Sequence, residues 1–148
     1  MAHDYFAAQE AMAGRLITLV PGLKSAAGAP GAAGAPGAGE NIGAPSPLPA
    51  VEVLHDGCQY LGRGTDQWLL RQRWKVSLTV DSMNDRRGSR ARAAAGPLLA
   101  RIISALAGWT PAQGCSPLEL ADGCGEEYHD GRARFSLLFV SIMALRPE

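Results

Sequence analysis

The spacing of apolar residues near the start of the chain predicts one amphipathic helix. From Tyr5 to Val20 an apolar side chain recurs every three or four residues. The stripe consists of Tyr5, Ala8, Met12, Leu16 and Leu19. Asp4 precedes it as a candidate N-cap, and Pro21-Gly22 ends it. A single helix of this length is only marginally stable in water, so we expect it to pack on the rest of the chain.

The segment 22–50 has almost no side chains to bury. Its residues 26–39 read AAGAPGAAGAPGAG, but four glycine triplets are too few for a collagen triple helix. Because a lone helix is not a domain, we predict a single domain, 1–148, that contains 22–50 as a long flexible loop. A short strand is expected near Leu23 to Ala26. The loop either orders against a partner or is a tolerated insertion.

Alternation of apolar and polar residues follows the loop and predicts strands. VEVLH is expected as a short strand, Asp56-Gly57 as a turn and Cys58–Arg63 as a return strand. The clearest strand is DQWLLRQRWKVSLTV, residues 66–80, which at about 3.3 Å per residue is longer than most and is expected to project as an arm. Its apolar face comprises Trp68, Leu70, Trp74, Val76, Leu78 and Val80, with Gln72 as a polar exception. Its outer face comprises Gln67, Arg71, Arg73, Lys75, Ser77 and Thr79.

A second helix is predicted after the charged turn DSMNDRRGSRAR. Ser89 is its candidate cap and Gly108 its C-terminal end, and Pro97 is expected to kink or divide it. Its core-facing stripe comprises Ala95, Leu99, Ile102 and Leu106.

Two further strand regions complete the pattern. SPLELAD places Leu118 and Leu120 on one face, and GEEYHDGRARFSLLFVSIMAL is typical of a hairpin around Asp130-Gly131. Its second arm is apolar on both faces from Leu137 onward, which indicates a central strand covered on both sides or by another subunit. The order of elements predicts an α+β fold, an antiparallel (mixed) β-sheet of 4–6 strands with two helices packed on one face.

Charge and hydropathy exclude some classes of partner. Fourteen basic and fourteen acidic side chains cancel, so no overall field attracts nucleic acid or an anionic membrane. No apolar run of about 18 residues is present to span a bilayer. The three cysteines, Cys58, Cys115 and Cys124, indicate free thiols in a reducing compartment.

Candidate catalytic chemistry is weak throughout the chain. His-Asp recurs at 3–4, 55–56 and 129–130, and the last two pairs lead into Asp-Gly turns rather than a phosphohydrolase site. His55 and Cys58 have zinc-ligand spacing, but Cys115 and Cys124 are too far apart to complete a knuckle. Neither a nucleophile elbow nor a phosphate-binding loop is present. We therefore predict no catalytic, cofactor or metal site and no enzymatic activity.

The order of these segments resembles a known family. LPAVEVLHDG, WLLRQRWKVSLTV, GPLLARIISALAGWTP, SPLELAD and YHDGRARFSLLFVSI follow one another as in the tail terminator, or tail completion, proteins of long-tailed bacteriophages, particularly Mu-like phages and prophages. The resemblance covers about Met1 to Ile142, and the Gly/Ala/Pro loop departs from it. It implies a virion protein, assembled in the bacterial cytoplasm, that forms a hexameric ring on the tail tube, stops tube polymerisation and offers a surface to the head connector. No cofactor is implied.

Two sets of residues are candidate contacts in such an assembly. The residues expected to face a partner or the lumen are Arg71, Arg73, Lys75, Arg86, Arg87 and Arg90. The residues expected at subunit interfaces are Trp68, Trp74, Leu138, Val140 and Ile142. The expected partners are identical copies, the tail tube protein, the head–tail connector protein and DNA passing through the lumen. Another neck protein of the same virion and a small nucleic-acid-binding module remain as alternatives.

Overall fold

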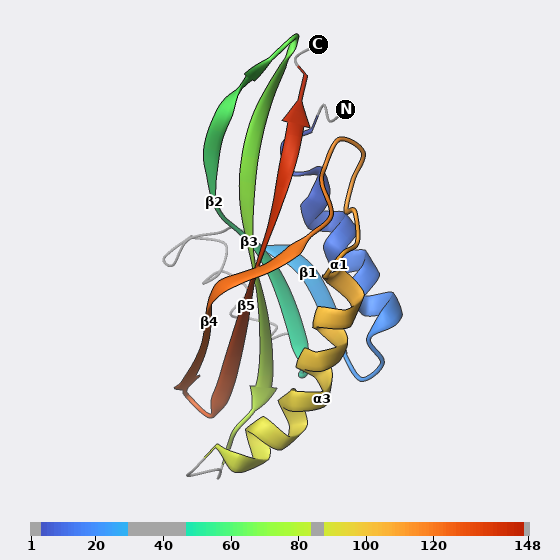
Figure 1. The fold of residues 1–148 in the computed structure, drawn as a ribbon. Coiled ribbons are helices and arrows are strands. Elements are labelled where there is room, and N and C mark those ends of the chain that lie inside the picture. Colours follow the sequence, from blue (N-terminus) through green and yellow to red (C-terminus); the bar gives the residue numbers. More distant parts are fainter. Residues whose placement is uncertain (1–3, 30–46, 84–87, 147–148) are drawn as a thin grey trace.

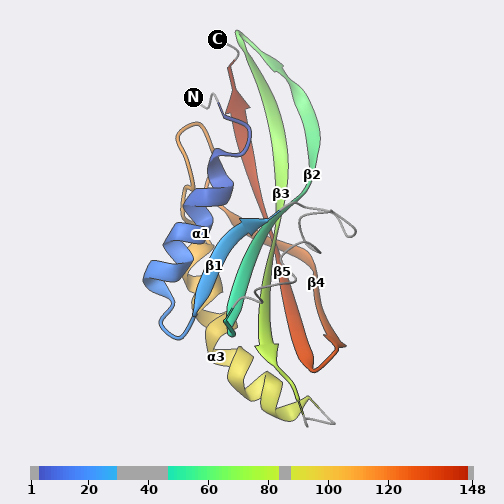
Figure 2. The same cartoon turned by 180° about the vertical axis from the view of Figure 1, so that it is seen from behind.

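The fold is a mixed five-stranded sheet with both helices on one face (Figures 1 and 2). The computed structural model describes residues 4–29, 47–83 and 88–146. Its elements are α1 (Ala7–Leu19), β1 (Ser25–Ala29), β2 (Ala50–Gly64), β3 (Gln67–Asp81), α3 (Ser89–Leu106), β4 (Glu119–His129) and β5 (Arg132–Leu145). The strand order is β1-β2-β3-β5-β4, in which only β1 pairs parallel with its neighbour. The predicted α+β class is confirmed.

The core lies between the sheet and the helices. Every second residue of β3 from Trp74 to Val80 points into it, as the alternation predicts, and opposite them β5 contributes Phe139, Leu137, Phe135 and Ala133. Trp74 and Phe139 have no exposed surface. Because a one-residue slip would turn this apolar set to the other face, burial fixes the register of the central strands.

Helix α1 packs with most of its predicted stripe. Ala8, Met12 and Leu16 are fully buried, but Leu19 is 47% exposed and Val20, just past the helix, is buried in its place. Asp4 does not cap the helix itself, which begins at Ala7. Its Oδ1 accepts a hydrogen bond from the Phe6 N–H at 2.9 Å, so Asp4 closes the turn ahead of the helix.

Helix α3 differs from the prediction at its start and centre. Gly88, at φ +72°, precedes it in place of the predicted cap Ser89, which is the first helical residue. Pro97 does not divide the helix, which runs through it from Ser89 to Leu106. Pro97 is exposed, whereas Ala95, Leu98 and Ile102 pack inward. Gly108 follows the C-terminus at φ +81°, as predicted.

Strand β2 is continuous, so the predicted turn at Asp56-Gly57 is wrong. Its partners on β3 pass from His55↔Trp74 to Cys58↔Gln72, which makes Asp56-Gly57 a β-bulge with Gly57 at φ +105°. The chain turns instead at residues 65–66, where Asp66 has φ +60°. The β2–β3 hairpin extends beyond the helices, and the end of β5 runs beside it (Figure 1). We call residues 58–72 the arm.

Strand β4 joins two segments that the sequence separates. The last four residues of SPLELAD and the first arm of the predicted hairpin form one strand, which a second bulge interrupts between Ala121 and Gly125. The predicted turn at Asp130-Gly131 is confirmed, with both residues at positive φ. The predicted loop 22–50 contains β1 at Ser25–Ala29, which begins two residues and ends three residues later than the strand expected near Leu23 to Ala26. Residues 30–46 lie outside the described part of the chain.

Candidate assembly interface

The sheet face opposite α1 and α3, which we call the open face, brings together most of the predicted contact residues. In the register of β3 and β5, Arg71 lies opposite Ile142, Arg73 opposite Val140 and Lys75 opposite Leu138. A cationic column (Arg71, Arg73 and Lys75) therefore runs beside an apolar column (Leu138, Val140 and Ile142). Residues predicted separately as partner-facing and as subunit-facing share one surface.

The cationic column is only weakly engaged within the chain. Arg73 Nε lies 3.6 Å from Asp56 Oδ2, and both side chains are almost half exposed, so solvent screens the pair and it adds little stability. Within residues 4–29, 47–83 and 88–146, neither Arg71 nor Lys75 forms an ion pair. These cations remain available to an acidic partner.

The bulge of β4 lies against the apolar column. Gly123 has φ +111°, and a Cβ placed on it would lie 2.5 Å from Leu138 Cδ1 and 4.0 Å from Arg73 Nη2. Leu138 is consequently only 5% exposed, whereas Val140 and Ile142 are half-buried. Glycine is thus required at position 123 for two independent reasons, its backbone conformation and the space available.

Strand β4 carries the opposite charge along its exposed side. Glu119 pairs across from Val140, Glu127 across from Arg134, and Asp122 lies in the bulge. All three are exposed, and no carboxylate among them has an ion pair in the described residues. We call Glu119, Asp122 and Glu127 the acidic edge.

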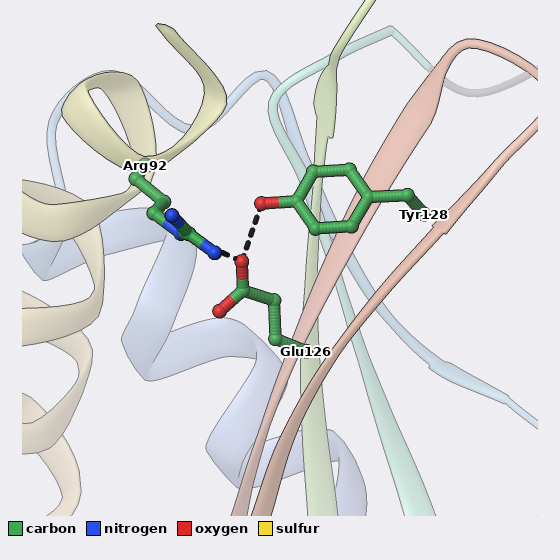
Figure 3. Close-up of polar contacts among 3 residues, drawn as sticks. All are labelled: Arg92, Glu126 and Tyr128. Atoms are coloured by element: carbon green, nitrogen blue, oxygen red, sulfur yellow. Dashed lines mark hydrogen bonds and ion pairs between the residues drawn. The ribbon is translucent and has the colours of Figure 1, made fainter. Parts of the chain in front are cut away.

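Glu126, on the helix side of β4, is engaged instead within the chain (Figure 3). Arg92 Nε of α3 donates to Glu126 Oε1 at 2.8 Å, and the Tyr128 hydroxyl donates to the same oxygen. The hydrogen bonds from Tyr128 and Arg92 lower the pKa of the Glu126 carboxyl. Together these contacts tie β4 to the first turn of α3.

The remaining predicted residues lie elsewhere. Trp74 is fully buried beneath the helices, so it offers no surface to a neighbouring subunit and is removed from the interface set. Trp68 is half-buried in the arm, with the Arg63 guanidinium 5.5 Å from its ring centroid. Arg90 is exposed in the first turn of α3, and Arg86 and Arg87 lie outside the described residues.

Tyr5, His55 and Gln72 form a polar cluster at the base of the arm. In the sequence only Gln72 pointed to it, as a polar residue on the apolar face of a predicted strand. Gln72 has no exposed surface, and its Nε2 donates to the Tyr5 carbonyl at 2.7 Å. Its Oε1 has no hydrogen-bond partner among the described residues. The Tyr5 hydroxyl lies 3.2 Å from His55 Nε2. Burial raises the pKa of Tyr5 to about 12 and lowers the pKa of His55. These hydrogen bonds connect Tyr5, just before α1, to strands β2 and β3 at the base of the arm.

One concavity of the described residues lies beside the β4–β5 turn, and its side chains show no arrangement typical of catalysis. A hollow of about 500 Å³ is lined by Thr79, Glu127, His129, Asp130, Arg132 and Arg134. His129 Nε2 lies 2.9 Å from Asp130 Oδ2, but both side chains are more than four-fifths exposed, as expected of a hairpin turn. No three metal-binding side chains gather within the described residues. None of the described helices is long and apolar enough to cross a membrane.

Comparisons with known proteins identify a family. The model of the family described as "Phage tail terminator protein" matches residues 1–147. A chain in the solved structure "Virion of native gene transfer agent (GTA) particle" is 14% identical, with a TM-score of 0.48, and the alignment covers 75% of this chain and 87% of that one. No curated protein matches the chain.

Proposed function

Because this chain belongs to the phage tail terminator family, we propose that it forms a ring on the end of the tail tube, stops the tube's polymerisation and joins the tail to the head connector. The family is one of structural proteins of the virion tail and neck. The match over residues 1–147 carries the proposal, because it includes both helices and all five strands rather than one motif.

The open face supports a role in protein assembly. It combines half-buried Val140 and Ile142 with the exposed cations Arg71 and Arg73, a mixture that suits a protein contact better than bulk water. The near-absence of internal ion pairs in the cationic column leaves these charges available to a neighbour. The ring is proposed to be a hexamer, with the tube protein on one side and the connector on the other.

The proposed function is tested by the growth of tail tubes. Tube subunits of the same phage are polymerised with and without this chain, and tube lengths are measured by electron microscopy. We expect the chain to shorten the length distribution and to bind at tube ends. Unchanged lengths together with no binding at tube ends would contradict the proposal, and binding to the connector alone would identify another neck protein.

A further inference from the structure

We propose that the cationic column of one copy binds the acidic edge of the next, so that identical chains join head to tail through the open faces of their sheets. This inference rests on the proposed function and specifies its subunit contact. The occupant of the open face is therefore a second copy of this chain, and its recognition is electrostatic around an apolar centre.

Strand-to-strand addition is the competing way to join two sheets, and the edges disfavour it. Within the described residues the sheet has three free edges. They are the outer side of β1, the part of β2 beyond Leu54 that β1 does not cover, and the outer side of β4. The edges of β2 and β4 are interrupted by bulges, at Asp56-Gly57 and between Ala121 and Gly125, and β1 has only 5 residues to offer. Bulges twist an edge strand and displace its hydrogen-bonding groups, and natural sheets use such bulges to prevent pairing between edges. The contact is therefore expected through side chains of the face.

The two charged sets are complementary, and in the described residues no ion pair joins them within one copy. Arg73 and Glu119 both lie opposite Val140, on its two sides, so their backbones are two strand spacings, about 10 Å, apart. The Arg73 guanidinium extends toward the β4 bulge, where Nη2 would lie 4.0 Å from a Cβ on Gly123. Direct contact with a second copy would bring opposite charges together and cover Val140 between them.

The position of the two sets favours a contact that can repeat. The cationic column lies in the middle of the sheet and the acidic edge at its margin, so a head-to-tail pair leaves one of each unoccupied. Such a heterologous contact adds further copies until a ring closes. The segment 30–46 is a poorer occupant by charge, because Glu40 is its only charged residue against three cations.

Charge reversal on either side of the contact tests the inference. The column variant is Arg71→Glu with Lys75→Glu, and the edge variant is Glu119→Lys with Asp122→Lys. Lys24→Glu with Arg101→Glu is the matched control, because both residues are exposed and the change in net charge equals that of the column variant. The mass of each protein in solution is measured by light scattering at low and high salt, and circular dichroism checks folding.

The expected masses distinguish the two sides. The wild type and the control should form the same multimer, whereas each reversed variant should remain near the 15.5 kDa monomer, with self-association at least about 30-fold weaker. An equimolar mixture of column and edge variants should give mixed multimers in which the two variants alternate. Both junctions are then complementary, because the reversed column meets the reversed edge and the unaltered column meets the unaltered edge. The fourfold variant, with both sides reversed, should recover the multimer, and added salt should weaken every complementary contact.

The opposing outcomes separate this inference from the ring itself. A column variant that keeps the wild-type multimer overturns the contact but leaves the ring proposal standing. A wild type that stops at a dimer contradicts a head-to-tail arrangement, and a wild type that is monomeric at high concentration contradicts both proposals. Loss of the multimer when residues 31–39 alone are deleted would assign the open face to that segment instead.

Discussion

Replacement of Gly123 by alanine tests whether the bulge of β4 shapes the open face. A non-glycine residue at φ +111° costs about 1–3 kcal/mol. The new Cβ would also lie 2.5 Å from Leu138 Cδ1, and moving that side chain off its rotamer costs about 0.5–1.5 kcal/mol. Gly123→Ala should therefore destabilise the fold by roughly 2–4 kcal/mol, which for a chain of this size lowers the melting temperature by roughly 5–15 °C.

The matched control for this variant lies two residues along the same strand. A Cβ on Gly125 would meet nothing within 4 Å, so Gly125→Ala should leave the melting temperature unchanged or slightly raised. Melting is followed by circular dichroism at one protein concentration, and mass in solution by light scattering. Because the bulge also carries Asp122, Gly123→Ala should weaken self-association more than Gly125→Ala does. Equal melting temperatures for the two variants would refute the role given to the bulge.

Three further predictions concern the core and the polar cluster. Trp74→Ala should lower the free energy of unfolding by about 3–5 kcal/mol in denaturant titrations, since the ring is fully buried. Trp74→Phe should cost clearly less, because Nε1 has no hydrogen-bond partner among the described residues; equal costs would contradict this packing. Burial lowers the pKa of His55, so the unfolded chain takes up the proton first as pH falls below about 6.5, and the melting temperature should fall with it. His55→Gln, which leaves Tyr5 and Asp56 in place, should make the melting temperature depend less on pH in this range. An unchanged pH dependence would contradict the role given to His55. Tyr5, with its pKa raised to about 12, should contribute stability below pH 10 that is lost as pH rises toward 12, and Tyr5→Phe should reduce this loss in alkaline melting curves.

Local patterns in the sequence predicted the elements whose geometry is set by neighbouring residues. The alternation from Trp74 to Val80 identified the buried face of β3, because apolar residues at every second position lie on one face of a strand. Asp130-Gly131 was recognised as a turn because the Asp-Gly pair itself favours the positive φ angles that a tight hairpin turn requires. Asp56-Gly57 was misread, because a positive φ at glycine serves a bulge as well as a turn, and only the register with β3 distinguishes them.

The open face depends on contacts that no local pattern contains. The columns adjoin because β3 pairs with β5, two strands separated in sequence by α3 and β4. The apolar spacing showed that Trp74 is buried, but not whether a helix or another subunit covers it. The acidic edge was missed for a similar reason. Asp122 and Glu127 belong to segments predicted as separate strands, and only the bulge places them along one margin of the sheet.

The position of the chain on assembled tails tests the central claim most directly. Purified tail tubes are incubated with the chain carrying a gold label, and the labels are located by electron microscopy. The account predicts labels confined to one end of each tube, with a ring visible there in averaged images. Labels distributed along the tube, or tubes that remain unlabelled at both ends, would contradict it.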